Sequence, residues 1–240
     1  MTRTRLVRVA AVCAVTAAAS LIVAGSTSAD SPSRQDFVVA ALAIPATPAT
    51  NIDDDATRFD TAHGYRAKID TVATASLNCN GCSSHAFTAH VVYAVRPHTV
   101  VADNVATAWA SACEGCSGWA LSLQIVVARS ARTLTAANRA LAFTTGCDHC
   151  SVKAAAVQIV VIAASERQLA PRQIDSIQAL YRQLLGALTP AASPAAARPQ
   201  TQQATPNQAT GALTTATERI QAVVVAGLHA TSATHAVTMH

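Results

Sequence analysis

The stretch that decides the fold spans residues 104–128 and reads NVATAWASACEGCSGWALSLQIVVA. The Cys-x-x-Cys motif within it recurs once before and once after, each time at a 34-residue step and with no insertion between copies. The three pairs are Cys79/Cys82, Cys113/Cys116 and Cys147/Cys150. Self-similarity at a fixed period is typical of repeat architectures. The sequence therefore predicts three consecutive copies of one structural unit.

Each copy has two alternating stretches around its cysteine pair. Over residues 120–127, bulky side chains alternate with small or polar ones, and residues 104–110 alternate before the pair. This period of two is expected for strands, so each copy is predicted to form strand, turn and strand. Asn80-Gly81 in the first turn favours a two-residue hairpin loop. A helical interpretation stays open, because these segments are rich in alanine, the best helix former.

A helical period begins after the last copy. Pro171 opens a segment whose apolar residues recur every three or four positions, which predicts an amphipathic helix. We expect its apolar stripe to lie across the bulky face of the strands or to cap the end of the array. The predicted fold class is mainly β (β-rich α+β), with three consecutive 34-residue β-hairpin repeats and a C-terminal amphipathic helix. The stripe consists of Ile174, Ile177, Leu180, Tyr181, Leu184, Leu185 and Leu188.

The flanking segments differ in composition from the repeats. Residues 1–29 combine three arginines with an apolar run of signal-peptide length, so we expect export and cleavage, with an uncleaved anchor as the alternative. Residues 30–64 are predicted to be a flexible N-terminal segment, and residues 65–188 the repeat domain with its helix. Residues 189–240 are predicted to be a low-complexity, largely disordered tail, although an apolar run near its end has the pattern of a short helix or strand.

The charge balance argues against nucleic acid as a partner. The chain has 17 basic and 13 acidic residues. Removing Arg3, Arg5 and Arg8 with the signal peptide leaves 14 against 13. Nucleic-acid binding draws on clustered Lys and Arg, which the remaining chain lacks.

Three chemistries compete for the cysteine pairs. An even set of cysteines in an exported chain indicates local disulfides that would staple each turn. Thiol–disulfide exchange is less expected, because the pairs lack the helix N-terminus that activates a thiol in redox motifs. Zinc is the third option, since Cys-x-x-Cys is half of a tetrahedral site, but three half-sites cannot pair off without help from histidine. The candidate histidines are His85, His90 and His149.

Two further residue sets are predicted to be structural. His90, Gln124 and Gln158 occupy one repeat position on the small-residue face, and we expect these side chains to satisfy one another. Trp109 and Trp119 flank the second pair, where cross-strand packing is favoured over a contact patch. No metalloprotease His-Glu-x-x-His, phosphate loop, catalytic residue or cofactor site can be assigned. The chain is therefore predicted not to be an enzyme.

Residues 104–128, residues 138–163 (NRALAFTTGCDHCSVKAAAVQIVVIA) and the helix LAPRQIDSIQALYRQLLGAL carry a family resemblance. Over about residues 65–188 the chain resembles repeat regions of exported actinobacterial proteins, many of which carry the label peptide zinc metalloprotease. The resemblance implies a non-catalytic extracytoplasmic module, because no zinc-binding helix of such a protease can be matched here.

These inferences converge on a secreted, non-catalytic structural or interaction module stapled by three local disulfides. The alternative is an extracytoplasmic thiol–disulfide or zinc-binding protein. Exposed strand edges of so short an array are expected to recruit another copy or a strand of a protein partner. We expect no small-molecule substrate, no cofactor, no nucleic acid and no membrane span after signal cleavage.

Overall fold

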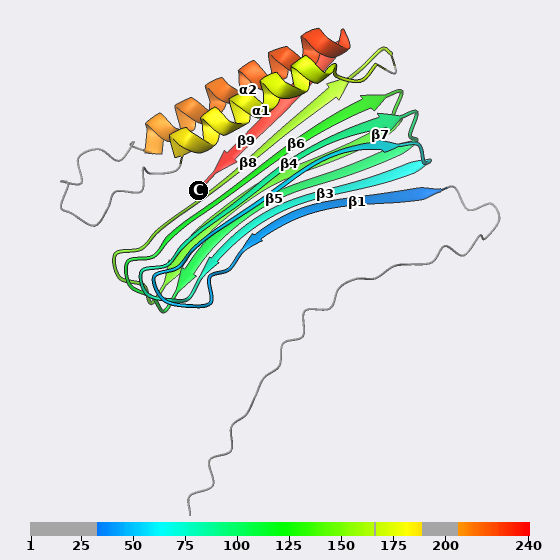
Figure 1. Ribbon diagram of the computed structural model, residues 1–240. Coiled ribbons are helices and arrows are strands. Elements are labelled where there is room, and N and C mark those ends of the chain that lie inside the picture. The colour runs from blue at the N-terminus through cyan, green and yellow to red at the C-terminus, as the bar shows by residue number, and fades with distance from the viewer. Residues whose placement is uncertain (1–32, 166, 189–205) are drawn as a thin grey trace, which may run out of the picture. The chain divides into compact units, whose positions relative to one another are not determined.

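The computed structural model describes residues 33–165, 167–188 and 206–240 (Figure 1). The predicted signal peptide lies outside the described residues. Within them, sheet A contains β1 (Arg34–Ala43), β3 (Arg66–Leu77), β5 (Thr99–Ser111) and β7 (Thr133–Thr145) in this order. Sheet B contains β2 (Asn51–Ala62), β4 (Ser83–Val95), β6 (Ser117–Arg129), β8 (Ser151–Ile162) and β9 (Ser232–Met239). The helices are α1 (Pro171–Leu188) and α2 (Pro206–Leu228).

Successive strands from β1 to β8 alternate between the two sheets, which makes the protein a β-solenoid of four coils. Each strand pairs in parallel with the equivalent strand of the next coil, so that Asn104 faces Asn138 at a 34-residue step. The mainly β fold class, the 34-residue repeat and the C-terminal amphipathic helix are therefore confirmed. The coils comprise residues 34–62 (coil 1), 66–95 (coil 2), 99–129 (coil 3) and 133–162 (coil 4).

The hairpin pairing within each copy is corrected by the structure. β5 and β6 belong to one copy, yet they lie in different sheets and hydrogen-bond to neighbouring coils instead of to each other. We call this arrangement, in which the two strands of one copy lie in different sheets, an arch. An alternating sequence pattern cannot distinguish a hairpin from an arch, because both consist of strand, turn and strand. The difference shows in burial, since all but the two end residues of β6 are buried.

Residues 30–64, predicted to be flexible, contain a full coil. β1 pairs with β3 from Arg34–Arg66 to Ala43–Ala75, and β2 pairs with β4. Asn51 faces Ser83, so coil 1 is followed at a 32-residue step. The step is 34 residues from β4 to β6 and from β5 to β7, although β3 pairs with β5 one residue short of it, with Thr71 facing Asn104. This coil also has no cysteine pair. Both departures hide coil 1 from a search for the repeat.

Small side chains make up one large buried cluster in the interior of the solenoid. The small-residue faces of sheets A and B face each other, so alanines from both sheets form one buried cluster. Toward the end of the coils away from the cysteines, valines, Ile69 and further alanines continue this interior. Because a methyl group is the usual interior side chain, a larger residue would force the sheets apart. The central cluster contains Ala41, Ala43, Ala73, Ala75, Ala86, Ala106, Ala108, Ala120, Ala140, Ala154 and Ala156.

The bulky face of sheet B points outward and is covered by both helices, which lie side by side across it (Figure 1). Ile177, Tyr181 and Leu184 of α1 pack in one core cluster with Leu121 and Leu123 of β6. The Tyr181 hydroxyl also donates to the Thr88 carbonyl at 3.0 Å. The prediction that the helix stripe lies across the bulky face is confirmed.

The predicted disorder of residues 189–240 is corrected for the part that the structure describes. Leu213, Ile220, Val224 and Leu228 of α2 are all fully buried in the same core as α1. β9 then pairs antiparallel with β8 and covers its edge. Alanine and threonine dominate this segment and make it look featureless, but alanine favours helix, and four large apolar residues at helical spacing anchor it.

Replacing Leu213 tests whether α2 belongs to the folded core. We expect Leu213→Ala to lower the free energy of unfolding by about 2–5 kcal/mol, because it leaves a cavity under the helix. Leu42→Ala is the matched control, since Leu42 is 54% exposed, and it should have little effect. Urea unfolding followed by circular dichroism measures both. Equal, small effects of the two substitutions would show that the tail does not contribute to the core.

The turns between the cysteines of each pair require a left-handed backbone at their second residue. Gly81, Gly115 and His149 have φ of 65°, 66° and 55°. Gly81 belongs to the Asn80-Gly81 turn that the sequence analysis singled out, although this turn joins two sheets and not two paired strands. A side chain at such a position is strained even where space is available.

Gly115→Ala is expected to lower stability by about 1 kcal/mol for this reason alone, because an added Cβ would meet no atom within 4 Å. Gly211→Ala in α2 is the control: it also has open space, but its position is helical, so stability should rise by about 0.5–1 kcal/mol. Urea unfolding midpoints should move in opposite directions. A shift of the same sign in both variants contradicts the assigned backbone conformations.

Candidate functional site

The three cysteine pairs lie one above another at the corner where each coil passes from sheet A to sheet B. Backbone hydrogen bonds connect the coils through this corner. The Gly81 amide donates to the Glu114 carbonyl and the Gly115 amide to the Asp148 carbonyl, both at 2.8 Å. The repeat thus continues through the turns, and cysteines at equivalent positions are stacked along the solenoid axis. We call this set of six residues the cysteine corner.

Within each pair the two sulfurs lie at disulfide distance. The Cα–Cα distances are 5.7 Å for Cys79–Cys82, 6.4 Å for Cys113–Cys116 and 5.9 Å for Cys147–Cys150. All three distances fall in the range that a disulfide spans. The geometry therefore allows a local bridge in every copy.

The surroundings of the sulfurs disfavour a reactive thiolate. Cys82, Cys113 and Cys116 are buried in an apolar cluster with Leu77 and Ala110. Cys116 Sγ lies 3.0 Å from the carbonyl oxygen of Cys79, and Cys82 Sγ lies 3.3 Å from that of Thr47. Carbonyl oxygens and apolar surroundings both destabilise a negative sulfur, whereas redox cysteines need an electropositive site. These surroundings disfavour thiol–disulfide exchange at Cys82, Cys113 and Cys116.

The last two pairs form a cluster that the sequence analysis missed. The sulfurs of Cys113, Cys116, Cys147 and Cys150 all lie within 4.8 Å of one another. Across the coils, Cys113 Sγ is 3.3 Å from Cys147 Sγ and 3.7 Å from Cys150 Sγ. Parallel stacking creates this proximity, because neighbouring strands lie about 4.8 Å apart.

The candidate histidines do not join the cysteines. His85 lies 2.6 Å from Asp53 Oδ1 and stacks on Phe87. His90 is fully buried between the sheets. His149 is exposed and occupies the left-handed turn position between Cys147 and Cys150. The four-sulfur cluster is the sole group among the described residues that is arranged to hold a metal. A mixed Cys/His site is thus not formed.

Polar residues form a band across the middle of the interior. Gln158 Nε2 donates to Gln124 Oε1 at 2.7 Å, and Gln124 Nε2 donates to Thr71 Oγ1 at 2.9 Å. Thr71 Oγ1 lies 3.1 Å from His90 Nδ1, and His90 Nε2 lies 3.0 Å from Asp60 Oδ2. The predicted mutual satisfaction is confirmed, with Thr71 linking His90 to the glutamines. Thr71 and His90 are buried with their polar atoms paired, and Asp60, whose side chain is 13% exposed, completes the series at its outer end.

A second polar row continues this band. Asn104 Nδ2 donates to Asn138 Oδ1 at 2.7 Å and to the Val157 carbonyl at 2.9 Å. Ser122 Oγ in turn donates to Asn104 Oδ1. The row joins both sheets and two coils, so it fixes the register of the stack.

The two tryptophans have different surroundings. Trp119 is buried in the outer core, with the Lys153 ammonium 4.6 Å from its ring centre, so the packing prediction holds for it. Trp109 lies on the outer face of sheet A, where it stacks on Phe143 at 6.0 Å between ring centres. Phe143 is 42% exposed. Phe143 is the register partner of Trp109 on the neighbouring strand, so the predicted cross-strand packing holds for Trp109 as well.

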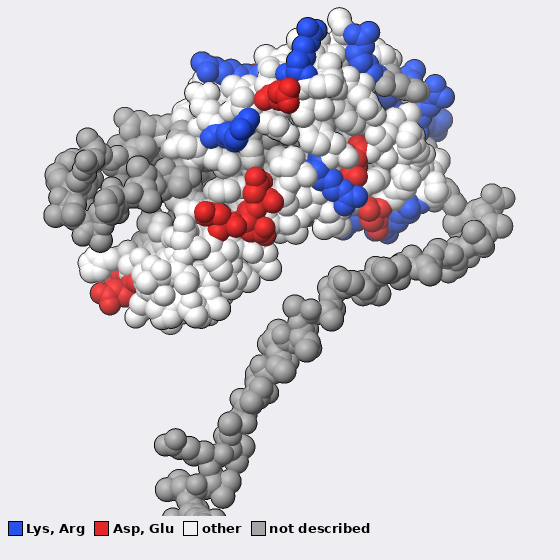
Figure 2. All heavy atoms as spheres, in the orientation of Figure 1, with Lys and Arg blue, Asp and Glu red and all other residues white. Residues whose placement is uncertain are grey.

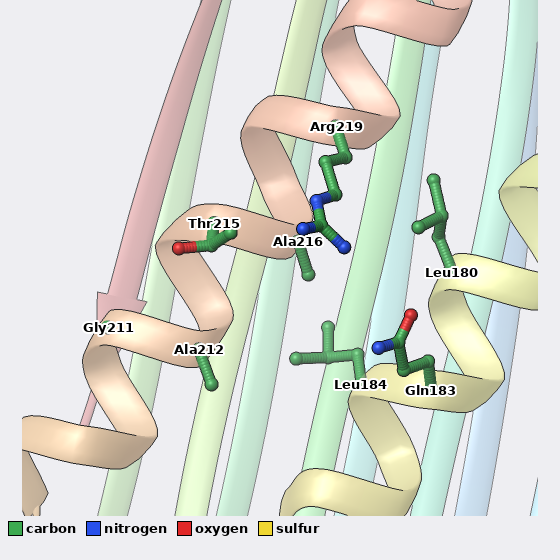
Figure 3. A pocket seen from close by; sticks show the side chains of 8 residues that line it. All are labelled: Leu180, Gln183, Leu184, Gly211, Ala212, Thr215, Ala216 and Arg219. Carbon is green, nitrogen blue, oxygen red and sulfur yellow. The ribbon is translucent and has the colours of Figure 1, made fainter.

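A groove runs between α1 and α2 (Figure 3). Leu180, Leu184 and Ala216 supply its apolar walls, and Arg219 carries the one charge among its lining residues. It lies in the outer helical layer, away from the cysteine corner. Neither helix in the described part of the chain is long and apolar enough to cross a bilayer.

His90 makes the fold sensitive to acid. Burial lowers the pKa of His90, although its hydrogen bond to Asp60 opposes the shift. As the pH falls below the ordinary histidine pKa of about 6.5, His90 is protonated in the unfolded chain but stays neutral in the folded chain. The free energy of unfolding therefore decreases with falling pH. We expect His90→Gln, which places in coil 2 the residue found in coils 3 and 4, to flatten the loss between pH 7 and pH 5. Urea unfolding at both pH values tests this, and an unchanged pH dependence would contradict it.

Comparison of the chain with protein-family models, curated proteins and solved structures finds no match. The arrangement itself is therefore the basis for assigning a function.

Proposed function

We propose that the protein is a secreted, non-catalytic interaction module whose three local disulfides close the turns of its coils. It self-associates through the β7 edge of sheet A. The cysteine pairs at disulfide distance and the signal-like segment support an oxidising location outside the cytoplasm. The polar band is buried and paired, which leaves it no room for substrate. Charged residues of both signs are sparse on the face that Figure 2 shows, in keeping with a partner other than nucleic acid.

The observation that carries this proposal is the edge of β7. Among the described strands, β7 pairs only with β5, whereas β9 covers the equivalent edge of β8. Natural edges are usually protected by lysine, proline or a bulge. Arg139 is the one charged residue of β7, and its guanidinium lies 2.5 Å from Asp103 Oδ2 on β5. β9 reaches this edge at one point, where Thr238 Oγ1 donates to the Asn138 carbonyl at 3.4 Å. The rest of this thirteen-residue strand lacks such protection, which favours addition of another strand.

A second copy of the chain fits this edge. Two β7 strands related by a two-fold axis would pair antiparallel and join the two A sheets into one. Leu141 and Phe143, which are 53% and 42% exposed, would then meet their counterparts near the axis. Because Asp103 balances Arg139, the two edges would not repel each other through uncompensated charge.

Proline substitutions at two adjacent positions test the edge. Backbone N–H groups alternate in direction along a strand, and proline has none. One of the two variants, Leu141→Pro or Ala142→Pro, therefore loses a hydrogen bond to β5. The other loses only a donor that points away from the sheet, toward the proposed second copy. We expect the wild type to form a concentration-dependent dimer in analytical ultracentrifugation. The proline variant that keeps the wild-type circular dichroism should be monomeric, as should Phe143→Lys. A wild type that stays monomeric at every concentration contradicts self-association. If all the variants fold and still dimerise, association through the β7 edge is contradicted.

A further inference from the structure

The four-sulfur cluster has the donor set of a metal centre as well as that of two disulfides. Tetrahedral zinc bound by four thiolates has Zn–S bonds of about 2.3 Å, which places its sulfurs about 3.8 Å apart. The contacts across the two coils, 3.3 Å and 3.7 Å from Cys113 Sγ, are already near this spacing. The Cys116 sulfur lies within 4.8 Å of the sulfurs of Cys147 and Cys150. The S–S distance within each pair must widen from a bond length, and the turns of coils 3 and 4 hold the Cα atoms 6.4 Å and 5.9 Å apart.

The three cysteine pairs of the cysteine corner have different neighbours. Above Cys79 and Cys82 lies coil 1, which offers the carbonyl oxygens of Pro45 and Thr47 at 3.6 Å and 3.3 Å from their sulfurs. On the other side, Cys116 Sγ lies 3.0 Å from the carbonyl oxygen of Cys79, and neither sulfur of the first pair belongs to the group whose members lie within 4.8 Å of one another. The first pair is therefore left as half a site. The last pair is also more accessible, because Cys147 and Cys150 are partly exposed while Cys113 and Cys116 are buried.

We propose that, when both bridges are reduced, Cys113, Cys116, Cys147 and Cys150 bind one thiophilic cation of the Zn²⁺ class. Each disulfide accepts two electrons and two protons from a dithiol reductant, which closes to its own disulfide, so two reductant molecules yield four thiols. Binding of Zn²⁺ then releases four protons and forms four Zn–S bonds. In the oxidised state each turn is closed by its own bridge, whereas the metal would link coil 3 to coil 4.

The test uses the whole exported protein, reduced with an excess of a dithiol that is then removed without oxygen. Co²⁺ serves as the spectroscopic probe and Zn²⁺ as its competitor. We expect one Co²⁺ per reduced chain, with the strong visible absorption of a tetrahedral thiolate site, displaced by Zn²⁺. The oxidised protein should bind none. Cys79→Ser/Cys82→Ser should keep the signal, whereas the matched double variant Cys147→Ser/Cys150→Ser should lose it.

Alkylation followed by peptide mapping gives a second readout. With Zn²⁺ present, the reduced wild type should be labelled at Cys79 and Cys82 and protected at the four cluster cysteines. Equal labelling of all six, or loss of the cobalt spectrum in the Cys79→Ser/Cys82→Ser variant, would overturn the assignment. A reduced chain that loses its β-type circular dichroism and does not regain it with Zn²⁺ would overturn it as well. None of these outcomes depends on whether the protein dimerises through β7.

Discussion

The narrow space between the two sheets is the constraint on which the rest of the structure depends. Alanine methyl groups from both sheets meet in the interior, so the strands cannot diverge or shift register without steric overlap or voids. Parallel pairing in register follows, since each coil must present the same small side chains at the same height. A fold with so few large interior residues gains little hydrophobic stabilisation from that interior.

Three features offset this thin interior. The helices cover the bulky outer face of sheet B and supply a second core rich in leucine, isoleucine and valine. The polar band from Asp60 to Gln158 and the Asn104 row connect coils through hydrogen bonds that only the correct register satisfies. The cysteine corner constrains each turn covalently when it is oxidised, and a four-residue loop closed in this way contributes about 2 kcal/mol in the chain-entropy model.

Much of this could be predicted from the sequence, because it depends on local pattern. The alternation around Cys113 indicates strands, Asn80-Gly81 indicates a turn, and the spacing after Pro171 indicates the helix and its buried stripe. What could not be predicted depends on which strands become neighbours. Arches and hairpins share one pattern, and coil 1 lacks both the cysteines and the 34-residue step.

The candidate site shows the same division. Sequence spacing identifies the cysteine pairs one copy at a time, but only parallel stacking brings Cys113 within 3.3 Å of Cys147. Three equal half-sites therefore look unmatched along the chain, while in space two are joined and one is separate. The tail was similarly hidden: alanine and threonine dominate α2, and its contribution rests on Leu213, Ile220 and Val224, whose burial requires the sheet beneath them.

The most direct test of the account is a map of backbone contacts between strands by nuclear Overhauser effects in isotope-labelled protein. Parallel coils in register predict amide-to-α-proton contacts between β5 and β7, around Asn104 with Asn138 and Ala106 with Ala140. The sheets should show no backbone ladder between β5 and β6. A ladder joining residues 104–111 to residues 117–123 would mean that each copy is a hairpin, and the solenoid, its interior and its stacked cysteines would all be contradicted.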